Sequence, residues 1–136
     1  MKPKSPKVKI SVRDLCKVFG EDPVSILPLL YDGIDKAELQ KKSDHILALN
    51  NINIDIFDGL ITVIMGLSGS GKSTLVRHIN RLIEPTSGKI LMDGNDIMKY
   101  DENELRQLRQ NRMSMVFQKF ALMPHQTVLE NTLMAP

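Results

Sequence analysis

The sequence predicts an α/β fold, and three observations carry this prediction. The apolar run at residues 60–65 has the composition of a strand that is buried on both faces of a sheet. The run leads directly into a glycine-rich loop that starts at Gly66. Beyond the loop, apolar residues recur at the spacing of one helix face until Glu84 and Pro85 end the pattern. These apolar residues are Leu75, Val76, Ile79, Leu82 and Ile83.

Other strands are expected before and after this strand, loop and helix. Apolar and polar residues alternate in residues 8–13 and again in residues 51–56, and this period of two predicts strands with one buried face. A short strand is expected at residues 89–92. An apolar strand is expected at residues 113–117, immediately before Gln118.

Turn and cap residues give further boundaries. Asp58 and Gly59 predict a hairpin turn between the strand that precedes them and the apolar run at residues 60–65, because glycine reaches positive φ without steric cost. Asp101 and Glu104 have the spacing of a capping box, which predicts a helix through Leu108.

Residues 21–45 have the character of an insertion. Pro23 and Pro28 interrupt regular structure early in this segment, whereas residues 32–43 are charged and free of proline. A short surface helix is therefore expected in the second half of the insertion.

Length, charge and cysteine content limit the classes of protein to consider. With 136 residues, the chain is expected to form one folding unit at most. A net charge of +2 gives no strong electrostatic preference for nucleic acid or anionic lipid. No apolar stretch approaches the roughly 20 residues of a membrane-spanning helix. The single cysteine, Cys16, cannot form an internal disulfide and, with no export signal, indicates a reducing cytosol.

The glycine-rich loop at residues 66–74 satisfies the Walker A pattern G-x-x-x-x-G-K-[ST]. Its glycines let successive backbone N–H groups point inward at phosphates, and the following helix adds its positive dipole end. Lys72 supplies a mobile positive charge for the β and γ oxygens, while Ser73 supplies a hydroxyl ligand for Mg²⁺. The predicted nucleotide-binding residues of the loop are Gly66, Ser68, Gly69, Ser70, Gly71, Lys72, Ser73 and Thr74.

The rest of the sequence resembles the ABC ATPase family over nearly its whole length. Residues 80–90 (NRLIEPTSGKI) and 93–97 (DGNDI) are similar to the stretch that links the P-loop helix to a β-hairpin in that family. Residues 115–118 (MVFQ) look like its Q-loop. The resemblance implies that Gln118 senses the γ-phosphate, Mg²⁺ and the attacking water. It also implies a P-loop NTPase fold of the ABC ATPase type, with an antiparallel β subdomain, incomplete at the C-terminus.

An aromatic residue near the first strand extends this resemblance. Residues 15–20 (LCKVFG) resemble the A-loop segment of the family, which places Phe19 where an aromatic ring stacks on adenine. Tyrosine is the commoner residue at that position, so Phe19 keeps the aromatic face and lacks the hydroxyl. A plain core phenylalanine is the alternative.

The insertion, the string at residues 64–74 and the string at residues 117–125 look like the glycine betaine/proline importer subunit of the family. This resemblance implies ATP and Mg²⁺ as cofactors. It also implies a membrane permease and a second ATP-binding subunit as partners, with a solute-binding protein engaged indirectly and no nucleic acid. The implied location is peripheral, on the cytoplasmic face of the bacterial inner membrane. The expected organisation is a flexible basic tail (1–7) and the amino-terminal part of an ABC domain (8–136), whose Q-loop and permease-facing region begin at 118–131.

Four motifs of the family have no match in the sequence, namely the signature, the Walker B Asp, the catalytic Glu and the switch His. The chain therefore looks like the amino-terminal part of a longer subunit, and we expect it to be a weak or inactive ATPase on its own. Another P-loop NTPase, such as a small-molecule kinase, and a non-catalytic nucleotide-binding module are the alternatives.

Overall fold

The structure is a computed structural model that describes residues 6–117 and 122–134. The chain divides into two compact units, Met1–Lys99 and Tyr100–Pro136. Each unit is described separately.

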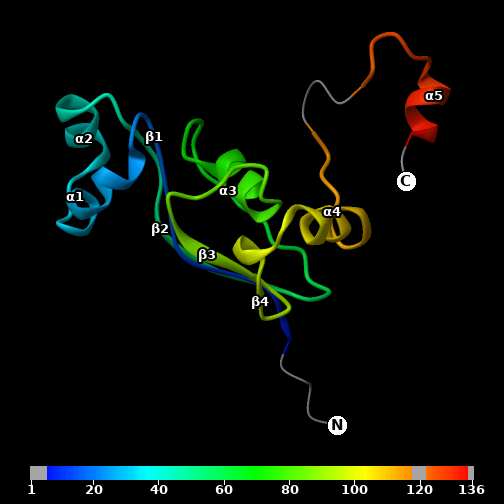
Figure 1. The fold of residues 1–136 in the computed structure, drawn as a ribbon, viewed down its shortest axis with the longest axis horizontal. Helices are drawn as coiled ribbons and strands as arrows, with labels where there is room; N and C mark the ends of the chain where they lie inside the picture. The colour runs from blue at the N-terminus through cyan, green and yellow to red at the C-terminus, as the bar shows by residue number, and fades with distance from the viewer. Residues whose placement is uncertain (1–5, 118–121, 135–136) are drawn as a thin grey trace. The chain divides into compact units, whose positions relative to one another are not determined.

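The first unit is built on an antiparallel sheet, which has four strands in the described residues, in the order β2-β1-β3-β4 (Figure 1). The strands are β1 (Val8–Phe19), β2 (Ile46–Phe57), β3 (Ser87–Met92) and β4 (Asn95–Asp96). The strands predicted at residues 8–13, 51–56 and 89–92 are confirmed as parts of β1, β2 and β3. Buried residues from β1 and β3, among them Val12, Leu15 and Ile90, form the core of this sheet.

An irregularity in β1 bends the sheet near Asp14. The pairing of β1 shifts register between Val12 and Leu15 on the β2 side, and Asp14 has a positive φ of 50°. Gly88 of β3 lies against this irregularity, because a Cβ atom at Gly88 would be 2.5 Å from the carbonyl oxygen of Asp14. Beyond it, β1 continues in pairing with β2 until Phe19 lies opposite Ile46.

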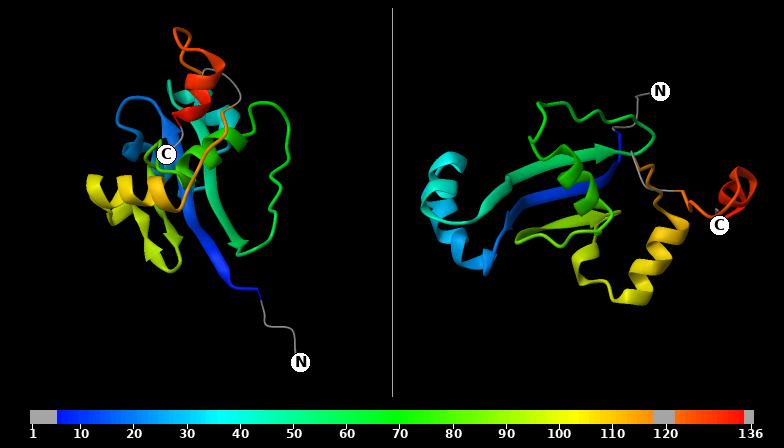
Figure 2. Two further views of the ribbon diagram at one scale, coloured as in Figure 1. Left: turned by 90° about the vertical axis from the view of Figure 1, so that its right-hand side faces the viewer. Right: turned by 90° about the horizontal axis from the view of Figure 1, so that it is seen from above.

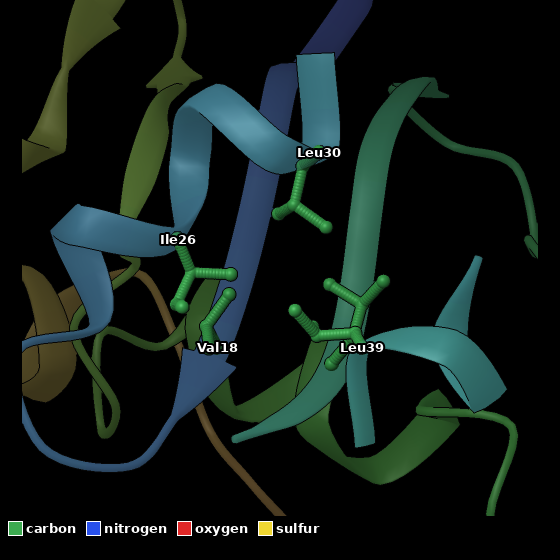
Figure 3. Close-up of a cluster of buried hydrophobic side chains, with 5 residues drawn as sticks. Val18, Ile26, Leu30 and Leu39 are labelled. Atoms are coloured by element: carbon green, nitrogen blue, oxygen red, sulfur yellow. The ribbon is translucent and has the colours of Figure 1, made fainter. Parts of the chain in front are cut away.

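Three short helices fill the insertion between β1 and β2: η1 (Pro23–Ile26), α1 (Leu27–Tyr31) and α2 (Lys36–Lys42). The short surface helix predicted in this segment is confirmed as α2. One buried cluster joins these helices to the adjoining ends of β1 and β2 (Figure 3). It contains Val18, Ile26, Leu30, Leu39 and Leu47.

Helix α3 (Lys72–Ile79) follows the glycine-rich loop and lies on one face of the sheet (Figures 1 and 2). It buries Leu75, His78 and Ile79. The predicted helix through Ile83 was too long by four residues, because Arg81 adopts a φ of 48° and its N–H bonds the His78 carbonyl at 2.8 Å. The helix therefore ends in a left-handed turn rather than at Pro85.

Two predicted strands are absent from the described residues. Residues 60–65 and 113–117 have no regular secondary structure. Asp58 and Gly59 do form a turn, but the hairpin predicted there is wrong, since residues 60–65 do not pair with β2. Ile61 is 94% exposed and Val116 97% exposed. An apolar run forms a buried strand only beside hydrogen-bonding neighbours, and no described residue pairs with either run.

The first unit ends with the 3₁₀ helix η2 (Ile97–Lys99), and the second unit contains α4 (Glu102–Asn111) and α5 (Val128–Leu133). The capping box predicted at Asp101 and Glu104 is confirmed, with both reciprocal hydrogen bonds present. Thr127 and Glu130 form a second capping box at the start of α5. The hydrogen bonds from Thr127 lower the pKa of the Glu130 carboxyl below its ordinary value.

His78 makes the stability of the first unit sensitive to acid. Its ring is fully buried and its Nδ1 lies 2.7 Å from the Thr74 carbonyl oxygen. Burial lowers the pKa of His78 below its ordinary value of 6.5. The unfolded chain therefore binds the proton more readily than the folded chain. We expect the free energy of unfolding to be undiminished above about pH 6.5 and to fall as the pH drops below it.

Chemical denaturation between pH 7.5 and 5 measures this effect. A His78→Leu variant lacks the titrating ring, so its free energy of unfolding should fall less over this range than that of the unaltered chain. Parallel curves for the two proteins would contradict the assignment.

Candidate nucleotide-binding site

The start of α3 presents a group of backbone N–H donors. The first hydrogen bond of the helix runs from the N–H of Leu75 to the carbonyl oxygen of Gly71, at 2.8 Å. The N–H groups of Lys72, Ser73 and Thr74 precede it and so have no acceptor within the helix. Together with the positive end of the helix dipole, these donors form a cradle for an anion such as phosphate.

The ammonium group of Lys72 lies inside the loop. Its Nζ donates hydrogen bonds to the carbonyl oxygens of Gly66 at 2.8 Å and Leu67 at 2.6 Å, and to Ser70 Oγ at 3.3 Å. The loop is therefore folded around a positive charge that belongs to its own helix. The ammonium group and the N–H donors both belong to residues that a phosphate group bound in this loop would contact.

The loop is fixed to the sheet by a close backbone approach. Gly71 has a φ of 90°, and a Cβ atom on it would lie 2.6 Å from the carbonyl oxygen of Ala48 and 3.0 Å from Leu49 Cδ2. Only glycine fits this position. Gly69 also has a positive φ, of 75°, yet a Cβ atom there would meet nothing within 4 Å.

A pocket of about 290 Å³ lies in front of the loop, within the first unit. Gly69, Ser70, Gly71, Lys72, Ser73 and Thr74 line it, together with Phe19, Lys36, Ile46 and Ala48. The structure thus brings Phe19 into the same pocket as six of the eight loop residues singled out in the sequence. Gly66 and Ser68 belong to the same loop but are outside the lining set.

Phe19 is held at the pocket wall by its neighbours on β1 and β2. Phe19 is 40% exposed, so it is not a buried core residue in this structure. The Lys17 ammonium lies 5.0 Å from the ring centroid, and the same ammonium donates to the Glu84 carbonyl oxygen at 2.8 Å. An exposed aromatic face beside a phosphate cradle suits a flat, uncharged ring system such as a nucleobase.

The remaining three lining residues, Lys36, Ile46 and Ala48, were missed by the sequence analysis. Ile46 and Ala48 stand at the start of β2, whose polar and apolar alternation was recognised only from residue 51 onward. Lys36 is one of three lysines on α2, and no motif distinguishes it from the others.

Of the two residues predicted to bind Mg²⁺, the structure describes Ser73 but not Gln118. Ser73 is in the first turn of α3 and lines the pocket, where its hydroxyl is a hard oxygen donor of the kind that Mg²⁺ prefers. Gln118 lies outside the described residues. Within residues 6–117 and 122–134, no group of three or more His, Cys, Asp or Glu side chains could hold a metal ion.

Comparisons with known proteins place this site in a family. The fold and the loop define a P-loop nucleotide-binding protein, and the family model described as ABC transporter matches residues 49–135. The chain belongs to the ABC transporter family.

Relatives with a curated description resemble the chain over most of its length. It is 49% identical over 92% of its residues to the glycine betaine/proline betaine transport system ATP-binding protein ProV of Escherichia coli (strain K12) and covers 31% of that protein. It is also 49% identical over 92% of its residues to the glycine betaine transport ATP-binding protein OpuAA of Bacillus subtilis (strain 168), covering 30% of it. The chain thus spans about a third of the length of these relatives.

A solved structure agrees with the fold. The dimeric post-hydrolysis state of the ATP-binding cassette MJ0796 bound to ADP and Pi matches with a TM-score of 0.69 and 31% identity, over 93% of this chain and 46% of that one. The match confirms the predicted ABC ATPase fold class. None of the helices in the described residues has the length and hydrophobicity needed to cross a membrane.

The contact between Gly71 and β2 generates a prediction with an internal control. Gly69→Ala and Gly71→Ala both place a Cβ atom on a residue with positive φ, which costs about 1–2 kcal/mol. Only Gly71→Ala adds a clash with the backbone of Ala48. We expect Gly71→Ala to lower the free energy of unfolding clearly more than Gly69→Ala, as measured by denaturant unfolding. Equal losses would show that the loop does not rest on β2 in solution.

Proposed function

We propose that the chain forms the ATP-binding part of an ABC importer subunit that couples ATP binding and hydrolysis to the uptake of glycine betaine/proline-type osmoprotectants. The observation that carries this proposal is the pocket that joins the Walker A loop at Gly69–Thr74 to the exposed ring of Phe19. One wall of it suits a triphosphate and the other suits a base. ProV and OpuAA are ATP-binding proteins of glycine betaine transport systems by name, which supports the proposed solute class.

Each part of the pocket has a role in this proposal. Backbone N–H groups at the start of α3 bind phosphate oxygens, and Lys72 exchanges its loop carbonyl partners for the β and γ oxygens. Phe19 stacks on the adenine ring. Ser73, with Gln118, would hold Mg²⁺, which supplies charge neutralisation between the phosphate oxygens when it is bound. Gln118 would also orient the attacking water.

The proposed partners follow from the family. A membrane permease and a second ATP-binding subunit are proposed to contact the importer subunit, with a solute-binding protein engaged indirectly through the permease. The MJ0796 cassette is dimeric by description, which supports the second subunit. The proposed location is peripheral, on the cytoplasmic face of the bacterial inner membrane.

Hydrolysis is proposed to need more than the described pocket. In-line attack on the γ-phosphate requires a group that activates water and a carboxylate that holds Mg²⁺. Neither lines the pocket. We therefore propose that residues 1–136 alone bind ATP but release phosphate no faster than their Lys72→Ala variant.

The central test of the proposal removes the charge at the loop. Lys72→Ala leaves the N–H cradle without its ammonium group, so we expect Mg-ATP affinity to fall tenfold or more, about 1.4 kcal/mol. Isothermal calorimetry measures the change, and Lys41→Ala on α2 serves as a control for the loss of an exposed lysine. Unchanged affinity in the Lys72→Ala variant would refute nucleotide binding at this site.

A second test concerns the base. Phe19→Ala should cost about 1–3 kcal/mol of ATP binding, since stacking on an aromatic face is lost, whereas Phe19→Tyr keeps the face and should stay near the unaltered affinity. Inorganic triphosphate has no base that could stack on residue 19, so its affinity should be the same in all three proteins. Equal affinity of the unaltered chain for ATP and triphosphate would rule out the adenine contact.

A further inference from the structure

The insertion contributes a second positive charge to the nucleotide pocket. Lys36 opens α2 and lines the pocket together with Phe19, Ile46 and the Walker A residues. The lining set contains two ammonium groups, on Lys36 and Lys72, and no carboxylate. An anionic ligand is therefore attracted from the insertion as well as from the loop.

The position of Lys36 is fixed by packing on both sides of the insertion. Leu39, one turn further along α2, is fully buried in the cluster that includes Val18 and Leu47 (Figure 3). Val18 and Leu47 are the strand neighbours of Phe19 and Ile46, which line the pocket. The cluster that holds α2 therefore places this helix beside Phe19, on the same pocket.

Local hydrogen bonds close the insertion and cap its helix. The Asp35 side chain accepts a hydrogen bond from the N–H of Glu38 at 2.7 Å, which fixes the first turn of α2 where Lys36 stands. At the base of the insertion, the His45 ring hydrogen-bonds the Glu21 carbonyl oxygen. Gly20 lies against that ring, because a Cβ atom on it would be 2.5 Å from His45 Cδ2. Both ends of the segment that carries Lys36 are thereby tied together next to Phe19.

The Lys36 ammonium is available for a ligand. Across residues 6–117 and 122–134, it makes no hydrogen bond or ion pair, whereas Lys42 of the same helix is paired with Glu38. Lys36 is also exposed, so its side chain can change rotamer at little cost. It differs in this from Lys72, whose ammonium already has three partners in the loop.

We propose that the Lys36 ammonium forms an ion pair with the phosphates of the nucleotide in this pocket. The insertion thereby supplies a phosphate contact in addition to those of the Walker A loop. The inference rests on the proposed function, because it takes the pocket to be the nucleotide site. In this arrangement Phe19 stacks on the face of the base, and Lys36 attracts the phosphates by its charge. The insertion is by this account part of the binding site.

The experiment compares lysine variants of α2 in the full chain. ADP binding is measured by calorimetry for the unaltered protein, Lys36→Ala, Lys36→Arg and the control Lys41→Ala, whose lysine is on the last turn of α2 and outside the pocket lining. An exposed ion pair is worth up to about 1 kcal/mol, so Lys36→Ala should weaken ADP binding about three- to fivefold. Lys36→Arg should retain most of the affinity, and Lys41→Ala all of it.

Two further arms identify the contact. Adenosine carries no phosphate, so its affinity should be unaffected by Lys36→Ala, and the loss for ADP should shrink as salt is raised. A loss that is equal for ADP and adenosine would overturn the proposal, since Lys36 would then contact the base or ribose through its stem. ADP affinity that is the same in Lys36→Ala and Lys41→Ala would also overturn it.

The Lys72→Ala variant separates this inference from the proposed function. If Lys72→Ala weakens ADP binding and Lys36→Ala does not, only the inference fails. If neither substitution weakens binding, the pocket is not the nucleotide site and the proposed function fails with it. Because Lys36 is exposed, thermal unfolding of its variants should match that of the unaltered chain.

Discussion

The close approach of Gly71 to the backbone of Ala48 is the constraint on which the site depends. A Cβ atom would not fit between the loop and β2 at this point, so the loop can contact the strand only when residue 71 is glycine. This contact sets where α3 begins and therefore where its free N–H groups point. It also brings the loop next to β2, the strand in which Ile46 pairs with Phe19 of β1. Without it, the phosphate cradle and Phe19 would be two separate features of the chain.

β2 transmits this constraint to the rest of the pocket. Its first residues pair with the end of β1, so that Ile46 lies opposite Phe19, and its Leu47 enters the cluster of the insertion. A strand that is fixed on one side by the loop and on the other by β1 leaves the insertion little freedom at its base. The register of β1 is irregular near Asp14, before the residues that pair with the start of β2. The backbone of Gly88 lies close against this irregularity, where a side chain would not fit. Glycine is needed both here and at Gly71 because backbone meets backbone in each place.

Much of the site was predictable from sequence because its chemistry depends on short-range patterns. The spacing of the glycines, Lys72 and Ser73 specifies a loop before a helix, and the capping box at Asp101 depends on a residue only three positions away. Features that depend on distant residues were not predictable in this way. Residues 60–65 have the composition of a buried strand, but pairing is decided by neighbours, and none of the described residues provides it. Lys36 is placed at the pocket by α2, whose Leu39 is buried in one cluster with Val18 and Leu47, and no local pattern encodes this packing between distant segments.

The Phe19 ring has a cationic neighbour, Lys17, that is not part of the pocket lining. The Lys17 ammonium lies over the Phe19 ring, at 5.0 Å from its centroid, and is itself held by the Glu84 carbonyl oxygen. A cation over an exposed ring is worth about 0.5–1 kcal/mol, which is enough to favour one orientation of the ring. Glu84 follows the end of α3, so the segment that leaves the phosphate cradle returns to support the residue that would bind the base. Phenylalanine has no hydroxyl group, so packing and this cation are the interactions that act on the ring itself.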